Sequence, residues 1–209
     1  MQYITSKAYF RNLVFEVNPD VLIPRFETEI LVDEVLKKIP QNGTLLDVGT
    51  GSGAIAISCA AERPDIFVVA VDISNAALTT AKRNAEKYGL KNIDFRHSDL
   101  ASAVLPNEKF NVVAANLPYV TNEEYATLQD EVRCCEPRLA LTANDNGLEL
   151  INKLCSNLNT LLIPGGYSIL EMSPWQTAII EKSLNDMGFE AKTINDFTGR
   201  LRFVCAEKK

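Results

Sequence analysis

The chain has 209 residues, of which 46% are hydrophobic and 23% are charged, and these ordinary globular proportions argue against intrinsic disorder. Its formal net charge of −6 weighs against a nucleic-acid substrate, because proteins that hold DNA or RNA usually present a basic face. No apolar run approaches the length of a membrane span and residues 1–11 lack a signal-peptide pattern, so we expect a cytoplasmic protein.

The first forty residues predict a short extension that precedes the main part of the fold. Residues 9–17 alternate loosely between apolar and polar side chains, which indicates a hairpin or an edge strand, and residues 18–20 indicate a turn. Apolar side chains then recur on one face of a helix that follows Pro24-Arg25 and ends at Pro40 and Gly43.

From residue 44 onwards, apolar strands alternate with helices. Strands are expected at residues 44–48, 67–71, 93–96, 110–115, 167–171, 190–194 and 201–206. Helices are expected at residues 54–61, 75–88, 148–162 and 175–187, with Ser74 capping the second and Pro164-Gly165-Gly166 stopping the third.

This alternation predicts a doubly wound, Rossmann-like α/β fold with a seven-stranded sheet that is mainly parallel. The last two strands should pair antiparallel, because no helix separates them. We expect one domain over residues 1–209, with a hairpin and a helix in residues 1–40 and the core in residues 41–209. Ligands of such sheets bind beyond the carboxyl ends of the strands.

The loop after the first core strand has the composition of a nucleotide-binding turn. Residues 47–53 have the sequence DVGTGSG, and the glycines let the backbone turn sharply and approach a ligand. Asp72 ends the next strand, where its carboxylate can accept hydrogen bonds from a ribose. These features also suit a dinucleotide. Two carboxylates favour S-adenosylmethionine (SAM): Asp47 can meet a cationic ligand through the loop, and Asp99 can meet an adenine amino group unless it only caps a helix.

The predicted cofactor site lies at the ends of the first four core strands. Its members are Asp47, Gly49, Thr50, Gly51, Ser52, Gly53, Asp72, Ile73, Ser98, Asp99, Leu100 and Asn116. No metal site is expected, because the chain has one histidine and no Cys-x-x-Cys, and its five cysteines are expected to be reduced thiols.

The fourth strand ends in Asn116-Leu117-Pro118-Tyr119, the predicted catalytic residues. The Asn116 side-chain oxygen and the Leu117 carbonyl can together hold an NH2 group, aim its lone pair at a methyl group and favour the positive charge that develops on nitrogen. Pro118 restricts the backbone, and Tyr119 offers a flat face to a planar substrate. The alternative is a plain strand-ending turn. The sequence therefore predicts a SAM-dependent N-methyltransferase.

At this level of detail the chain resembles the release-factor glutamine methyltransferases of the HemK/PrmC type, which are class I SAM-dependent methyltransferases. The similar segments are residues 2–4, VLIPRFETEILV at 21–32, DVGTGSG at 47–53, NLPYV at 116–120, EPRLAL at 136–141, Asn146-Gly147-Leu148, Pro164-Gly165-Gly166, Leu170-Glu171 with Gln176, and Gly199-Arg200. The resemblance implies that a peptide chain release factor is the substrate. The side-chain amide nitrogen (N5) of glutamine in its Gly-Gly-Gln motif would be methylated, leaving S-adenosylhomocysteine.

By the same resemblance, Asn116 and the Leu117 carbonyl hold the glutamine amide, and Glu27, Thr28 and Tyr119 line the substrate crevice. Glu171 is a further candidate on its strand-end position alone. Leu117 replaces the first proline of the family's Asn-Pro-Pro-Tyr, and Phe26 replaces the second proline of Pro-Arg-Pro-Glu-Thr-Glu.

The family's N-terminal helical domain, which helps to engage the release factor, has no counterpart in this sequence, so recognition through a partner subunit or a separate domain is also considered. The loop that holds an NH2 group would equally serve a small amine or amide, or adenine in nucleic acid. A non-catalytic partner that keeps the SAM fold and an NAD-dependent oxidoreductase are the remaining alternatives.

Overall fold

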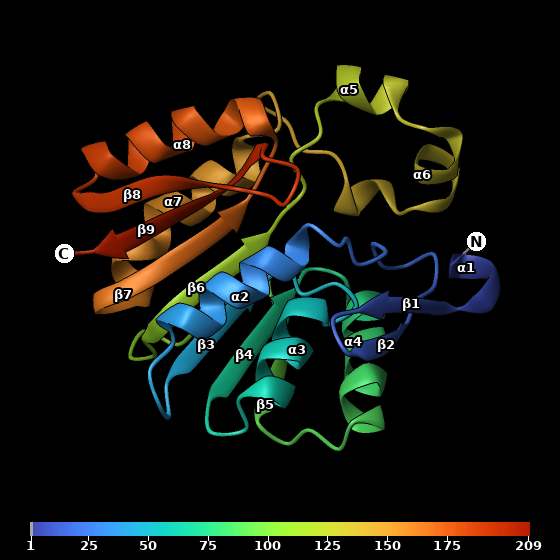
Figure 1. Ribbon diagram of the computed structural model, residues 1–209, viewed down its shortest axis with the longest axis horizontal. Helices are drawn as coiled ribbons and strands as arrows, with labels where there is room; N and C mark the ends of the chain where they lie inside the picture. Colours follow the sequence, from blue (N-terminus) through green and yellow to red (C-terminus); the bar gives the residue numbers. More distant parts are fainter. Residues whose placement is uncertain (1) are drawn as a thin grey trace.

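A seven-stranded sheet lies at the centre of the computed structural model, which describes residues 2–209 (Figure 1). Its strands are β3 (Thr44–Val48), β4 (Phe67–Asp72), β5 (Ile93–His97), β6 (Phe110–Asn116), β7 (Leu162–Glu171), β8 (Phe189–Asn195) and β9 (Leu201–Lys208). The strand order is β5-β4-β3-β6-β7-β9-β8. Strands β3 to β7 run parallel, whereas β9 is antiparallel to both β7 and β8. The predicted α/β fold and the antiparallel final pair are confirmed.

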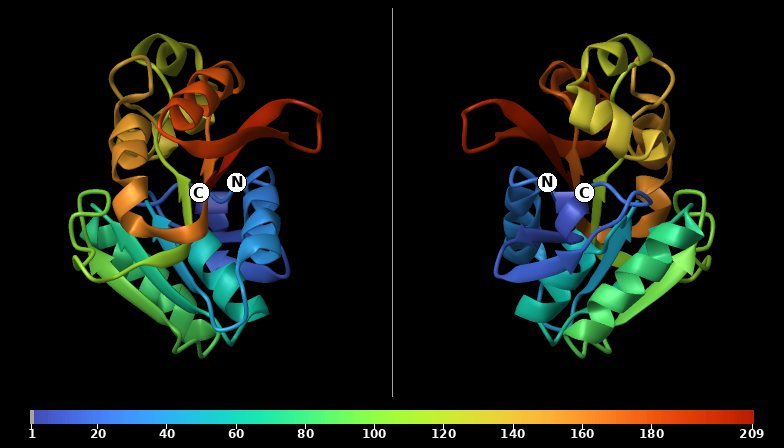
Figure 2. Two further views of the ribbon diagram at one scale, coloured as in Figure 1. Left: turned by 90° about the vertical axis from the view of Figure 1, so that its left-hand side faces the viewer. Right: turned by 90° about the vertical axis from the view of Figure 1, so that its right-hand side faces the viewer.

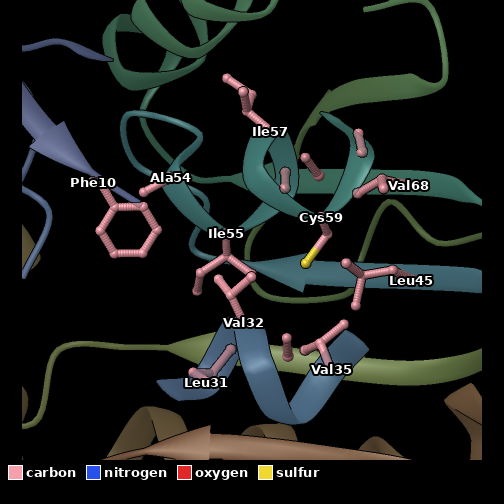
Figure 3. Close-up of a cluster of buried hydrophobic side chains, with 14 of the residues drawn as sticks. Phe10, Leu31, Val32, Val35, Leu45, Ala54, Ile55, Ile57, Cys59 and Val68 are labelled. Carbon is pink, nitrogen blue, oxygen red and sulfur yellow. The ribbon is translucent and has the colours of Figure 1, made fainter. Parts of the chain in front are cut away.

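Helices cover both faces of the sheet. One face carries α2 (Thr28–Lys38), α3 (Ala54–Glu62) and α4 (Asn75–Lys87), and the other carries α7 (Glu149–Leu161) and α8 (Pro174–Asp186). Each face of the sheet carries its own hydrophobic core, the first under α2, α3 and α4 and the second under α7 and α8. Leu45 belongs to the first core and Leu46 to the second, because successive side chains of a strand point to opposite faces. Figure 2 shows the N-terminal segments and α7 on opposite sides of the sheet. Figure 3 shows Val32 beside Ile55 and Leu45 beside Cys59 in the first core.

The N-terminal extension is tied to the first of these faces. It consists of α1 (Gln2–Thr5) and the antiparallel hairpin β1 (Lys7–Phe10) and β2 (Leu13–Glu16), which confirms the predicted hairpin. The buried Asn84 of α4 accepts a hydrogen bond from Glu16 N (2.7 Å) and donates to Glu16 O (3.0 Å) and Ser52 O (2.9 Å). One side chain therefore joins the hairpin to the glycine-rich loop.

One feature differs from the sequence prediction, and two others were not predicted. Pro164-Gly165-Gly166 lies within β7, where residues 163–166 bulge between the pairs Phe110–Leu162 and Val112–Tyr167. Strand β9 lies between β7 and β8, an order that hydrophobic periodicity does not encode. The segment between β6 and α7 holds the short helices α5 (Asn122–Thr127) and α6 (Asp130–Cys135) and a 3-10 turn, η1 (Arg138–Ala140).

Figure 1 shows α5 and α6 standing apart from the sheet. Within residues 2–209, no helix has the length and apolar character that crossing a bilayer requires.

Candidate active site

A pocket of about 400 Å³ opens at the carboxyl ends of β3, β4, β5 and β6. This size is typical of small-molecule sites, and the position is where ligands of doubly wound sheets bind. The strand-end loops contribute residues 48–52, 72–74, 98–100 and 116–118 to its lining. Two segments that were not predicted also line it: residues 19–25, apart from Ile23, and residues 137–140, apart from Arg138. The remaining lining residues are Thr28, Ala54, Ile55, Ala77 and Leu150.

The glycine-rich loop faces the pocket with its backbone. Gly49, Gly51 and Gly53 have φ values of +77°, +56° and +86°, which favour glycine. A Cβ atom on Gly51 would meet no protein atom within 4 Å, so the loop leaves room there for the close approach of a ligand. Gly51 N donates to Asp72 Oδ2 (2.8 Å), and Ser74 N donates to Asp72 Oδ1 (2.9 Å). Asp72 thus joins the loops that follow β3 and β4.

Asp47 acts on this loop from beneath and does not line the pocket. Its fully buried Oδ2 accepts hydrogen bonds from Thr50 Oγ1 (2.7 Å) and Ala56 N (3.1 Å), so it holds the loop against the start of α3. Its Oδ1 has no hydrogen-bond partner within residues 2–209. Burial raises the pKa of Asp47 to about 7. Gly53 also lies outside the lining, where a Cβ would come within 2.5 Å of Ile57 Cδ1.

Asn116 and Leu117 begin the loop that follows β6, which we call the acceptor loop (residues 116–119). They bring it against the glycine-rich loop. Asn116 ends β6 at the pocket wall, and Leu117 and Pro118 continue the wall. The Leu117 side chain is buried in the second core, and a Cβ on Gly49 would lie 3.0 Å from Leu117 Cδ2. The leucine that replaces a proline of the family pattern therefore packs tightly under the glycine-rich loop.

A short chain of hydrogen bonds runs behind Asn116. Asn116 Nδ2 donates to Thr28 Oγ1 (3.2 Å), and Thr28 Oγ1 donates to Glu171 Oε2 (2.8 Å). Thr28 also lines the pocket, whereas Glu171 is fully buried behind it. Glu27, the other residue expected in the crevice, does not line the pocket.

Tyr119 does not line the pocket, and its backbone is held in place by neighbouring residues. Gln176 Nε2 donates to Tyr119 O (3.1 Å) and to Asn146 O (3.1 Å), and a Cβ on Gly147 would overlap Tyr119 O. Only glycine therefore fits at residue 147. The half-buried Tyr119 side chain lies outside the lining, and burial raises the pKa of its phenol to about 12.

An ion pair connects the two segments that were not predicted. Arg25 Nη2 lies 2.6 Å from Glu136 Oε1, whose side chain is only 3% exposed. We call the Arg25–Glu136 pair the clasp, because it joins the segment ahead of α2 to the segment that follows α6. Both residues belong to motifs of the family resemblance, but their separation of 111 residues leaves no local sequence signal for the contact.

The lining fits the expected SAM cofactor. Asp72 keeps lone pairs for the hydroxyl groups of a ribose, and Asp99, two residues after β5, lines the pocket together with Ile73 and Leu100. Gly51 provides the open backbone approach described above. Within residues 2–209, no three His, Cys, Asp or Glu side chains are grouped to hold a metal ion.

Comparison with known proteins identifies close sequence relatives. The model of the methyltransferase small domain matches residues 26–140. A release factor glutamine methyltransferase from Neisseria gonorrhoeae is 40% identical over 193 residues, which cover 92% of this chain and 70% of the relative. The proteins of the same name from Enterococcus faecalis and Bacillus subtilis are 39% and 37% identical, and the matches cover 99% of this chain and 75% and 74% of the relatives.

Solved structures share the fold at low sequence identity. The 16S rRNA N2 G1207 methyltransferase of T. Thermophilus, in complex with AdoMet and guanosine, matches with a TM-score of 0.69 at 18% identity, over 97% of this chain and 50% of that chain. The ribosomal protein L11 methylase of Lactobacillus delbrueckii matches with a TM-score of 0.64 at 22% identity, over 88% and 81% of the two chains. At these identities the likeness concerns the fold alone.

Proposed function

The chain belongs to the release factor glutamine methyltransferases, and we propose that it transfers a methyl group from SAM to the N5 nitrogen of the glutamine in a release factor's Gly-Gly-Gln motif. The observation that carries the proposal is the contact between the two loops: the acceptor loop of Asn116 and Leu117 packs directly on the glycine-rich loop at Gly49. An NH2 group held by the first loop therefore lies next to a ligand held by the second.

Hydrogen-bond acceptors on this chain carry the chemical step. When bound, SAM supplies an electrophilic methyl group. The Asn116 Oδ1 atom and the Leu117 carbonyl accept the two N–H groups of the glutamine amide and hold its nitrogen in line with that methyl group. Both acceptors also stabilise the positive charge that develops on nitrogen as it attacks. The amide proton is lost to solvent water after attack, so the step requires no strong base.

The cofactor is held by groups of a different kind. We assign the ribose to Asp72, the adenine to Asp99 and Leu100, and the remainder of SAM to the backbone at residues 49–52. Asp47 and Gly53 contribute by shaping this loop, because neither lines the pocket. Glu27, Thr28 and Tyr119 remain the proposed residues of the substrate side, with Thr28 directly at the pocket.

Methyl transfer from labelled SAM tests the proposal. The acceptors are an intact release factor, its Gly-Gly-Gln peptide and the Gln→Ala form of each, with free glutamine and an adenine-containing oligonucleotide as competing classes. Label should appear on the factor and be lost from its Gln→Ala form. An enzyme that binds SAM yet leaves the factor unlabelled would overturn the proposal, and label on glutamine or on the oligonucleotide would identify the other class.

A further inference from the structure

Three polar side chains from distant parts of the sequence meet behind the acceptor loop. Asn116 of β6 pairs in register with Glu171 of β7, and Thr28 at the start of α2 lies between their side chains. Thr28 is 4% exposed and Glu171 is 2% exposed. Burying a carboxylate to this extent costs free energy that hydrogen bonds and opposite charges must offset, and the proposed mechanism assigns this one no role.

The hydrogen bonds from Asn116 through Thr28 to Glu171 have a fixed order of donors and acceptors. An ionised carboxylate only accepts hydrogen bonds, so Glu171 makes the Thr28 hydroxyl its donor. That hydroxyl has one proton, and toward Asn116 it can then only accept, so the NH2 end of the carboxamide faces Thr28. The carbonyl end of Asn116 is left to face the pocket.

We infer that Glu171, acting through the Thr28 hydroxyl, determines which end of the Asn116 carboxamide faces the substrate amide. Glu171 and Thr28 are therefore positioning residues for methyl transfer. The inference rests on the proposed function, in which Asn116 accepts a hydrogen bond from the substrate. The same orientation of Asn116 also determines the specificity for an amide substrate. Two acceptors, Asn116 Oδ1 and the Leu117 carbonyl, bind an uncharged NH2 group and repel the carboxylate of a glutamate at the same place.

The surroundings of Glu171 connect this orientation with pH. Arg202 of β9, together with Arg25 and Glu27 ahead of α2, are the charged groups that face it. The phenol of Tyr119 faces it from the acceptor loop. Burial outweighs the two arginines and raises the pKa of Glu171 to about 7. A protonated Glu171 can donate to Thr28, which frees the hydroxyl to donate to Asn116 and lets the carboxamide turn over. The productive orientation therefore becomes more populated as the pH rises through this range.

Two variants with one matched control test the inference. Thr28→Val keeps the shape of the side chain and removes the hydroxyl, Glu171→Gln removes the charge, and Thr28→Ser retains the hydroxyl. We expect kcat to fall about ten- to hundredfold in T28V and E171Q, with the KM for the release factor little changed, and to return in T28S. Wild-type kcat should rise with pH near 7, and this rise should disappear in E171Q.

Affinity for SAM and thermal stability separate positioning from a structural role. Positioning leaves SAM binding by calorimetry close to that of the wild type, whereas a structural role lowers kcat, SAM affinity and melting temperature together. A T28V enzyme with the kcat of the wild type, an equal loss in T28V and T28S, or a pH dependence that survives in E171Q would each overturn the inference.

A second readout does not require the methyl acceptor. In 15N spectra, the side-chain NH2 signals of Asn116, assigned by their loss in Asn116→Ala, should shift with pH near 7 in the wild type and stay constant in E171Q. A wild-type enzyme that shows this titration but labels no release factor would overturn the proposed function alone. Signals that do not titrate in an active enzyme would overturn the inference alone.

Discussion

Two buried carboxylates lie on either side of β6 and serve the two halves of the site in different ways. Asp47 of β3 holds the cofactor half through Thr50 and Ala56, three and nine residues away in the sequence. Glu171 of β7 holds the acceptor half through Thr28, which is 143 residues away. Burial raises the pKa of both groups to about 7. The carboxylate of the cofactor half thus acts on one continuous loop close to it in sequence, whereas the carboxylate of the acceptor half acts on a distant segment.

Asn116→Ala should have the largest effect and should affect only the acceptor half. Removing the carboxamide takes away one of two acceptors that stabilise the developing charge, so we expect kcat to fall about 10²- to 10³-fold. SAM affinity should remain close to that of the wild type, because Asp72 and the glycine-rich loop hold the cofactor. Single-turnover kinetics and calorimetry measure the two quantities. A loss of SAM affinity as large as the loss of kcat would show that the two halves do not act separately.

Asp47→Asn probes the carboxylate of the cofactor half through stability. Folding raises the pKa of Asp47 from 3.8 to about 7, so its contribution to stability is complete below 3.8 and is lost as the pH rises to about 7. Each such group lowers the free energy of unfolding by about 1.4 kcal/mol per pH unit in this window. Urea denaturation without SAM should show a shallower pH dependence in D47N than in the wild type.

Glu171→Gln is the matched comparison, because burial shifts the pKa of Glu171 in the same direction. It should flatten the stability profile as D47N does and should additionally remove the rise of kcat with pH. A D47N profile as steep as that of the wild type would mean that folding does not raise the pKa of Asp47.

Sequence reasoning predicted the loop conformation of the cofactor half, because the interactions that shape this loop are local. The residues at 47–53 and Asp72 are separated by one helix, and the positive φ values at the glycines follow from their residue type. The strands and long helices were also predicted closely, since each has its own hydrophobic period. The role of each residue toward the cofactor stays a prediction, including that of Asp47, which the structure places beneath the loop.

Contacts between distant segments explain what the sequence did not predict. The clasp joins residues 111 apart, and no local pattern indicates that Arg25 and Glu136 are partners. Helices α5 and α6 have six residues each, too few for a hydrophobic period to appear. Glu171 was a candidate only by its position at a strand end, because its connection to Asn116 depends on Thr28 from another element.

The clasp should have a smaller effect than Asn116, and chiefly on stability. In Arg25→Met the buried Glu136 loses its partner at 2.6 Å, and we expect the free energy of unfolding to fall by about 1–3 kcal/mol. The double variant Arg25→Met/Glu136→Gln should recover part of this loss, because an uncharged amide is less costly to bury. A double-mutant cycle by urea denaturation measures the coupling. Additive effects of the two substitutions would show that the ion pair does not join these segments in solution.

Gly51→Ala should have the smallest effect on the fold, and its matched control, Gly89→Ala, makes it the sharpest test of the cofactor half. Both glycines have positive φ values, +56° and +64°, and a Cβ on either would meet no protein atom within 4 Å. The cost of the backbone conformation should therefore be similar in the two variants, about 1–2 kcal/mol of stability.

The two positions differ in what lies beyond the backbone. Gly51 lines the pocket and Gly89 follows the end of α4, so only G51A should weaken SAM binding, by about tenfold or 1.4 kcal/mol. Calorimetry with SAM on both variants measures the difference. If G51A and G89A bind SAM equally well, the cofactor does not approach the loop at Gly51. SAM binding would then depend on the side chain of Asp72. Both halves of the site would hold their ligands through side chains.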